Sequence, residues 1–297
     1  MDKSNFNDDV SGLACDNDKG LCKDGDKVFD NPVLPAYARV SINRCNLPAI
    51  ILGGVTFQRQ PCDLYLDGIS EFHRDLFSRL DAVSDVAQRA QVFRDYVTVK
   101  FCLEDLVAAG LSDKSQKRAN ANWMRMVRGW SFDADSREGA VLKGWVESRF
   151  GLLPRYHGAP LRDYSEPAYR RFLEMRSAGL YGTNALESQL DLLYAYAQYE
   201  YRRQGALAAQ MLYRGINRLG EHEILAEHGR SKYVLLNNLT SFTHSRERAS
   251  EFGDYIMEAK VPVQKIFFHC QLLPGVLRGE DECLVIGGVY EVRIRSD

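Results

Sequence analysis

This chain lacks any local cysteine motif for a metal or a disulfide framework. There are seven cysteines among 297 residues, an odd number, and no two of them form a Cys-x-x-Cys pair. This count and spacing argue against a set of disulfide bonds and against a zinc site. We therefore expect reduced thiols in a cytoplasmic protein.

A strong net charge and a long apolar run are also missing. The formal net charge is -2 and the isoelectric point is about 6.3, so nothing in the overall charge favours nucleic acid or a membrane surface as a partner. The apolar run Leu47–Val55 is too short to cross a bilayer. No basic start is followed by an apolar stretch, so no signal peptide is expected.

The composition that is present is typical of a soluble globular protein, with 45% apolar and 26% charged residues. Residues 1–30 are rich in Asp, Asn, Gly and Lys and predict a disordered acidic tail. Residues 31–297 are expected to form a single domain. At its start, apolar runs between Pro and Gly breaks predict short strands or irregular structure over residues 31–60.

Residues 69–205 are expected to be mainly helical, because apolar residues recur three to four positions apart. The clearest helix is predicted to begin at Asn184, with Asn184 as its cap and Glu187 in the position of a capping-box acid. Arg202 and Arg203 are expected to stabilise the negative, C-terminal end of the helix dipole, and the helix is expected to stop at Gly205. Its tyrosines are interpreted mainly as packing residues.

Residues 206–297 are rich in Val, Ile, Tyr and Phe and predict a strand-rich region. The expected strands are AAQMLYRGI, SKYVLLNNLTSFT, DYIMEAKVPV, KIFFHCQLL, ECLVIGG and VYEVRIR, with a short helix in SRERASEFG. Because helices and strands are segregated along the chain, the predicted fold class is α+β.

Two acids, Glu280 and Glu282, stand at the entry of one predicted strand. Side chains two positions apart on a strand point the same way, so these like charges would repel unless a cation or a developing positive charge lies between them. An oxocarbenium-like sugar or a guanidinium would meet that need. The alternative is an ordinary acidic turn in solvent.

Two upstream stretches carry residues that suit a ligand. Arg214 and Gly215 end one predicted strand, where a guanidinium could bind phosphate or carboxylate oxygens and a glycine would allow close approach of the backbone. Ser241 and Thr243 share one face of the next strand and could orient a carboxylate across a cleft. Each stretch alone also fits an ordinary strand end or a helix cap.

Taken together and in this order, Arg214, Ser241 with Thr243, and Glu280 with Glu282 resemble the R-S-E core of arginine-specific mono-ADP-ribosyltransferases. Phe252 matches the aromatic residue that this family carries on the helix after its serine motif. From residue 31 to the C-terminus, VSINRCNLPAIILGGVTFQRQP, GLYGTNALESQLDLLYAYAQYEYRRQGA and LTSFTHSRERASEFG resemble the bacterial dinitrogenase-reductase ADP-ribosyltransferases of nitrogen fixers.

The resemblance implies NAD as co-substrate, bound in a cleft between two small sheets, and no metal. It implies an NAD site formed by Arg214, Gly215, Ser241, Thr243, Phe252 and Glu282. Within that site Ser241 would orient Glu282, and Glu282 would stabilise the oxocarbenium ion. Glu280 would align and deprotonate the acceptor guanidinium.

The resemblance also implies partners. The acceptor would be an arginine of the nitrogenase iron protein, and its modification would reversibly inactivate nitrogenase. A PII signal-transduction protein would act as regulator. Two alternatives on the same scaffold stay open: an NAD glycohydrolase, against which Glu280 counts, and a non-catalytic interaction module.

Overall fold

The computed structural model describes residues 32–104, 122–206, 208–218, 220, 222–274 and 281–296. The predicted disordered tail, residues 1–30, lies outside these ranges, so it stays a prediction, as does the single domain over residues 31–297. Of the helices in the described ranges, none is both long enough and apolar enough to span a bilayer.

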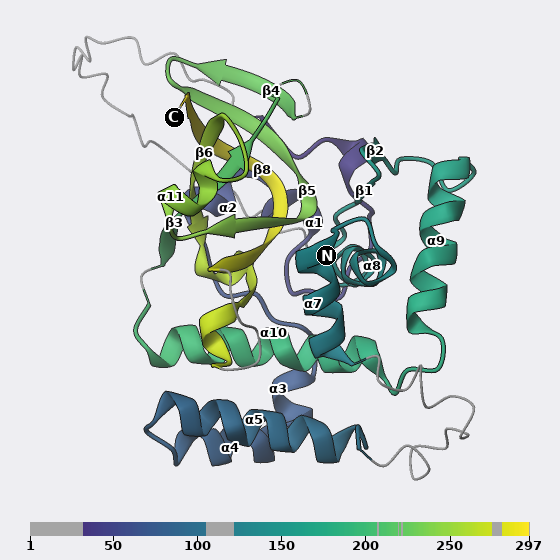
Figure 1. The fold of residues 1–297 in the computed structure, drawn as a ribbon, viewed down its shortest axis with the longest axis vertical. Helices are drawn as coiled ribbons and strands as arrows, with labels where there is room; N and C mark the ends of the chain where they lie inside the picture. The colour runs from purple at the N-terminus through teal and green to yellow at the C-terminus, as the bar shows by residue number, and fades with distance from the viewer. Residues whose placement is uncertain are drawn as a thin grey trace, which may run out of the picture. The chain divides into compact units, whose positions relative to one another are not determined.

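Helices fill the first two thirds of the described chain (Figure 1), and over residues 69–205 the apolar spacing predicts them. They are α1 (Ala49–Leu52), α2 (Val55–Arg59), α3 (Ile69–Phe72), α4 (Arg74–Asp81), α5 (Val86–Lys100), α7 (Trp123–Phe132), α8 (Arg137–Phe150), α9 (Pro167–Leu180) and α10 (Leu186–Arg203). A last short helix, α11 (Arg246–Ser250), interrupts the strands where SRERASEFG predicts it.

Strands dominate the last third, and the α+β class is confirmed. A small hairpin of β1 (Arg155–Tyr156) and β2 (Ala159–Pro160) precedes them. The others are β3 (Ala209–Ile216), β4 (Glu223–His228), β5 (Ser231–Thr243), β6 (Tyr255–Pro262), β7 (Ile266–His269) and β8 (Glu282–Ser296).

Within the described residues these six strands form one antiparallel network in the order β4-β5-β3-β6-β8-β7, and β5 also pairs with β8. The extra pairing joins β3, β5, β8 and β6 into a closed ring. The long strand β8 pairs with two strands of this ring: its residues 282–293 pair with β5, and its residues 292–296 pair with β6. The pairing brings the end of β5 beside the beginning of β8.

Helix α10 lies between the strands and the α4–α5 pair (Figure 1). Its apolar face consists of Leu186, Leu190, Leu193 and Ala197, all fully buried as their spacing predicts. Tyr194, Tyr196 and Tyr201 are buried as well, which confirms that the tyrosines mainly pack against neighbours.

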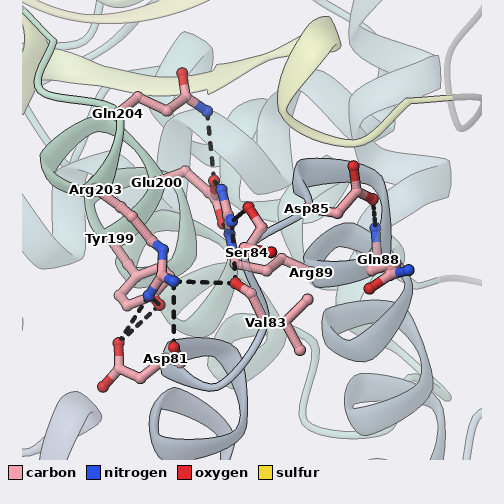
Figure 2. A network of polar contacts seen from close by, with 10 residues as sticks. All are labelled: Asp81, Val83, Ser84, Asp85, Gln88, Arg89, Tyr199, Glu200, Arg203 and Gln204. Atoms are coloured by element: carbon pink, nitrogen blue, oxygen red, sulfur yellow. Dashed lines mark hydrogen bonds and ion pairs between the residues drawn. The ribbon is translucent and has the colours of Figure 1, made fainter.

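A buried ion pair fixes α5 against α10 (Figure 2). The Arg89 guanidinium donates Nε–H to Glu200 Oε1 over 2.7 Å and Nη2–H to Glu200 Oε2 over 2.8 Å. The two side chains are only 3% and 0% exposed. Arg89 Nη1 donates to the carbonyls of Val83 and Ser84, so the guanidinium is bonded on every side.

Removing one partner of this pair should destabilise the fold strongly. We expect Arg89→Met to lower the free energy of unfolding by about 3–5 kcal/mol, because Glu200 is left charged and unpaired in the interior. Urea denaturation measures this loss as a lower midpoint. Arg89→Met/Glu200→Met should recover most of it, and Arg79→Met at the exposed Arg79–Asp75 pair should cost less than about 1 kcal/mol. Equal losses for Arg89→Met and Arg79→Met would contradict this account.

Lys265 gives the fold a pH dependence. Its buried Nζ donates to the Gly287 carbonyl and lies 4.6 Å from the centroid of the Tyr290 ring. Burial lowers the pKa of Lys265 from 10.5 to about 7. Between those two pH values the unfolded chain binds more protons than the folded chain, so stability rises with pH by at most about 1.4 kcal/mol per unit.

We therefore expect Lys265→Met to abolish this part of the rise in stability between pH 7 and pH 9. Urea denaturation at both pH values tests it. Lys260→Met, at an exposed position on β6, is the matched control and should keep the slope of the unchanged protein. An unchanged slope in Lys265→Met would show that Lys265 does not titrate in this window.

Five features differ from the sequence predictions. Residues 49–59 form the short helices α1 and α2 rather than the expected short strands or irregular structure, because Pro48 and Gly54 take extended conformations that begin a helix at the next residue. The predicted cap at Asn184 is wrong: α10 begins at Leu186 after Ala185 in a left-handed conformation, and Asn184 donates instead to the Phe101 carbonyl.

The strand β4 was not predicted, because its polar sequence EILAEH lacks the usual run of β-branched residues. It lies at the edge of the sheet and pairs only with β5 among the described strands, where polar residues are tolerated. The stretches ECLVIGG and VYEVRIR form one continuous strand, β8. The stretch KIFFHCQLL is a strand only as far as His269.

Candidate active site

The carboxylate of Glu282 lies where β5 ends and β8 begins. Glu282 pairs with Thr243 in the register of these strands, and Ser241 lies two residues earlier on β5. Residues directly opposite or diagonal on an antiparallel pair share one face, so the Ser241 hydroxyl can reach the carboxylate. Ser241 Oγ donates to Glu282 Oε1 over 2.6 Å.

Helix α7 supplies the remaining contacts of this carboxylate. Ser131, near the end of α7, donates its hydroxyl proton to Glu282 Oε2. Trp130 Nε1 donates to Ser241 Oγ over 2.8 Å, which leaves the serine proton for Glu282. Both carboxylate oxygens are therefore held in place, and one of the two serines is itself positioned by a buried indole.

Arg214 comes from the adjacent strand β3 and faces the same region. Its Nη1 donates to the Ser241 carbonyl over 2.8 Å. Its Nε is buried and has no hydrogen-bond partner within the described part of the chain. Burial lowers the pKa of Arg214 below its ordinary value, and the negative charge of Glu282 partly offsets this. A buried N–H without a partner is costly, and a bound anion would satisfy it.

These side chains border a cleft with a volume of about 400 Å³. A cleft of this size is within the range that binds small molecules and cofactors. Two exposed aromatic rings stand on its border, Phe132 from α7 and Phe252 after α11. Their side chains are 92% and 57% exposed, and Phe132 is the most exposed large apolar residue in the described ranges. Exposed rings at a cleft can stack on the planar rings of a ligand.

Gly215 also borders the cleft, but packing explains its lack of a side chain. A Cβ at Gly215 would lie 2.1 Å from the Ala249 carbonyl oxygen, and a Cβ at Gly253 would lie 2.5 Å from the Ile216 backbone. The two glycines allow β3 and the α11 segment to approach closely. The sequence predicts that the backbone at Gly215 approaches a neighbour closely, and in the structure that neighbour is the α11 segment. Contact between Gly215 and a ligand remains a prediction.

Thr243 contacts a different carboxylate from the one that Ser241 contacts. Its hydroxyl lies 3.3 Å from Asp281 Oδ2, and the backbone N–H of His244 donates to the same oxygen over 3.0 Å. Thr243 thus fixes the residue that precedes Glu282.

The cleft gathers all but one of the sequence-predicted site residues. Glu280 lies outside the described residues, so its placement stays a prediction. The others, which all line the cleft, are Arg214, Gly215, Ser241, Thr243, Phe252 and Glu282. Trp130 and Ser131 are additional and were not predicted as site residues. Their stretch, NANWMRMVRGWS, indicates a packed helix, and nothing in its spacing shows that its end reaches β5.

The arrangement can stabilise a positive charge next to a bound anion. The Glu282 carboxylate is pre-oriented by two hydroxyls, and fixed dipoles of this kind stabilise charge that develops in a transition state. The Arg214 guanidinium offers a charged donor fork for phosphate or carboxylate oxygens. The described residues thus suit an anionic substrate in which a cationic centre forms.

Comparison with known proteins identifies one family of enzymes. Residues 42–294 match the model of a family described as dinitrogenase reductase ADP-ribosyltransferase (DRAT). The chain is 36% identical, over 267 residues, to the NAD(+)–dinitrogen-reductase ADP-D-ribosyltransferase of Rhodospirillum rubrum. That alignment covers 85% of this chain and 94% of the relative. No solved structure matches this chain.

Proposed function

This chain belongs to the dinitrogenase reductase ADP-ribosyltransferase family, and from this premise we propose that it transfers ADP-ribose from NAD to an arginine of dinitrogenase reductase, reversibly inactivating nitrogenase. The observation that carries the proposal is the doubly held Glu282 carboxylate in the same cleft as Arg214. An ADP-ribosyltransferase needs an acid beside the departing nicotinamide and a cation for the phosphates.

NAD fits the donors and acceptors of the cleft. The unpartnered Nε–H of Arg214 would bind a phosphate oxygen or the adjoining ribose. The Gly215 backbone would bind the nicotinamide amide. Phe252 is exposed at the border of the cleft and would pack on the nicotinamide ring or its ribose.

Glu282 would act at the bond that breaks. Its carboxylate would accept a hydrogen bond from the ribose 2′-hydroxyl and stabilise the oxocarbenium ion that forms as the bond between the ribose and nicotinamide breaks. The bonding electrons leave with nicotinamide, which departs neutral. The hydroxyls of Ser241 and Ser131 keep the carboxylate in place, so little reorganisation is needed as charge develops.

An arginine acceptor needs a second acid. A guanidinium stays protonated in water, with a pKa above about 12, and is a poor nucleophile in that form. In this proposal Glu280 aligns the incoming guanidinium and takes its proton as the new bond between nitrogen and sugar forms. The products are nicotinamide and an ADP-ribosylated arginine.

The finer parts of the proposal rest on the family resemblance. We propose that a PII signal-transduction protein regulates the enzyme and that the chemical step needs no metal. We also include a cytoplasmic location, which the free thiols of Cys45, Cys62, Cys102, Cys270 and Cys283 favour.

Labelled NAD separates this function from its alternatives. The protein is incubated with NAD labelled in the ADP-ribose part, alone and together with dinitrogenase reductase. The proposal expects label on the partner protein. Free ADP-ribose without labelled partner would favour an NAD glycohydrolase, and no turnover under either condition would favour a non-catalytic interaction module; both results would overturn the proposed function.

Ser131 offers a test of how the acid is held. We expect Ser131→Ala to lower kcat for transfer by about 10-fold or more, because a hydrogen bond to a charged group contributes about 1.5–3 kcal/mol. The KM for NAD should change little. Ser131→Thr keeps the hydroxyl and should retain most of the activity. Steady-state kinetics on the three proteins decide the point, and equal kcat in Ser131→Ala and the unchanged protein would contradict it.

A further inference from the structure

Four side chains of metal-binding type gather beside the proposed active site, at the end of β5, the end of β7 and the start of β8. Asp281 and Cys283 flank Glu282, and they meet His244 from the end of β5 and His269 from the end of β7. Neighbouring residues on a strand point to opposite faces, so the Cys283 side chain leaves the face that Glu282 occupies. Asp281 lies just before β8 and also borders the cleft. The cluster therefore adjoins the cleft through Asp281 but does not include the Glu282 carboxylate.

The potential ligand atoms are closely spaced. His244 Nδ1 lies 3.4 Å from Cys283 Sγ and 3.5 Å from Asp281 Oδ2, and His269 Nε2 lies 3.0 Å from Asp281 Oδ1. The ligand atoms of His244, His269 and Cys283 all lie within 4.8 Å of one another. Tetrahedral zinc with bonds of about 2.0–2.3 Å separates its ligand atoms by about 3.3–3.8 Å, so small side-chain movements would complete the geometry.

Hydrogen bonds from neighbouring residues orient the potential ligand atoms of the cluster. His244 Nε2 donates to Gln210 Oε1 over 2.8 Å, which places the proton on Nε2 and leaves the Nδ1 lone pair facing the cluster. Metal-binding histidines generally donate their second ring N–H in this way. Thr243 and the His244 backbone orient Asp281. Cys283 is fully buried, and His269 is 7% exposed.

A hydrogen-bonded polar cluster is the competing explanation. In that case Asp281 would accept from His269 Nε2 and from the backbone N–H of His244. This network satisfies Asp281 and leaves the fully buried Cys283 thiol one contact, as a weak donor to His244 Nδ1 over 3.4 Å. The set of two imidazoles, a thiolate and a carboxylate is instead typical of a zinc-class ion.

We propose that His244, His269, Asp281 and Cys283 bind one zinc-class ion, which ties the start of β8 to the ends of β5 and β7. The ion would hold the residues on both sides of Glu282, and so would position the acid without contacting the substrate. The absence of Cys-x-x-Cys spacing does not exclude this site, because strand pairing brings its ligands together from residues 244–283. The inference does not depend on the proposed function.

Cobalt is a suitable probe because a cobalt–thiolate bond absorbs in the near ultraviolet and tetrahedral cobalt absorbs strongly in the visible region. The full chain is stripped with a chelator, dialysed and titrated with Co²⁺. We expect both bands to appear and to saturate at about one ion per chain. Cys283→Ser should lose the near-ultraviolet band, and Gln210→Ala should keep the bands but bind about 10–100-fold more weakly.

Cys270→Ser is the matched control, since the Cys270 thiol also lies within 4.8 Å of the ligand atoms of His269 and Asp281; it should keep both bands. If Cys283→Ser does not fold, His244→Gln decides, because its side chain is 34% exposed and its loss should weaken Co²⁺ binding at least 10-fold. The proposal is overturned by an absence of saturable bands in the unchanged protein. It is also overturned if Cys270→Ser loses the thiolate band, or if Cys283→Ser and His244→Gln both bind like the unchanged protein.

Discussion

Glu282→Gln should reduce both NAD cleavage and ADP-ribose transfer by about 10²–10³-fold or more. The substitution keeps the size of the side chain but removes the negative charge that stabilises the oxocarbenium ion, and charge stabilisation of this kind is often the largest single catalytic contribution. It also places an amide where Ser241 and Ser131 donate to two carboxylate oxygens. Release of nicotinamide and labelling of the partner protein measure the two activities.

The affinity for NAD should fall far less than the rate, because Arg214 and the border of the cleft would still bind the dinucleotide. Titration of Glu282→Gln with NAD separates the two effects. Glu227→Gln, at an exposed position on β4, is the matched control and should behave like the unchanged protein. Near-normal NAD cleavage by Glu282→Gln would mean that this carboxylate is not the acid at the bond that breaks.

Glu280→Gln should have a selective effect. We expect transfer to arginine to be abolished while slow NAD hydrolysis continues, because water can attack the oxocarbenium ion without help from a second acid and a protonated guanidinium cannot. Measuring free ADP-ribose and labelled partner protein in one reaction shows how the products divide. Asp254→Asn is a suitable control, since it removes an acid from a position outside the lining of the cleft.

A Glu280→Gln variant that modified its target at a normal rate would end the division of labour between the two acids. A variant that lost hydrolysis and transfer equally would also contradict that division, because Glu280 would then act at the bond that breaks. Together the two substitutions separate the roles: Glu282 is needed for both products, Glu280 for one.

The sequence predicts those helices and strands whose residues show a clear local pattern. Leucines spaced three to four apart predict α10, and the β-branched and aromatic runs predict β3, β5, β6 and β8. Arg214, Ser241 and Glu282 fall on those strands. Strand pairing then brings Ser241 beside Glu282 without a further assumption. This part of the cleft could be predicted because each residue belongs to an element with a clear pattern.

The parts that the sequence does not predict depend on tertiary contacts. Ser131 and Trp130 reach Glu282 and Ser241 only because α7 packs against β5, more than a hundred residues later in the chain. Asn184 fits a helix cap locally, but its amide bonds to the Phe101 carbonyl instead. The cluster around Cys283 is likewise assembled by strand pairing, which no spacing of cysteines or histidines reveals.

The most direct test of the central claim is a mass-spectrometric map of dinitrogenase reductase after incubation with NAD and this protein. The account predicts a single ADP-ribose on an arginine side chain, absent when Glu282→Gln replaces the unchanged protein. Modification of a different residue type, or equal modification by both proteins, would contradict it.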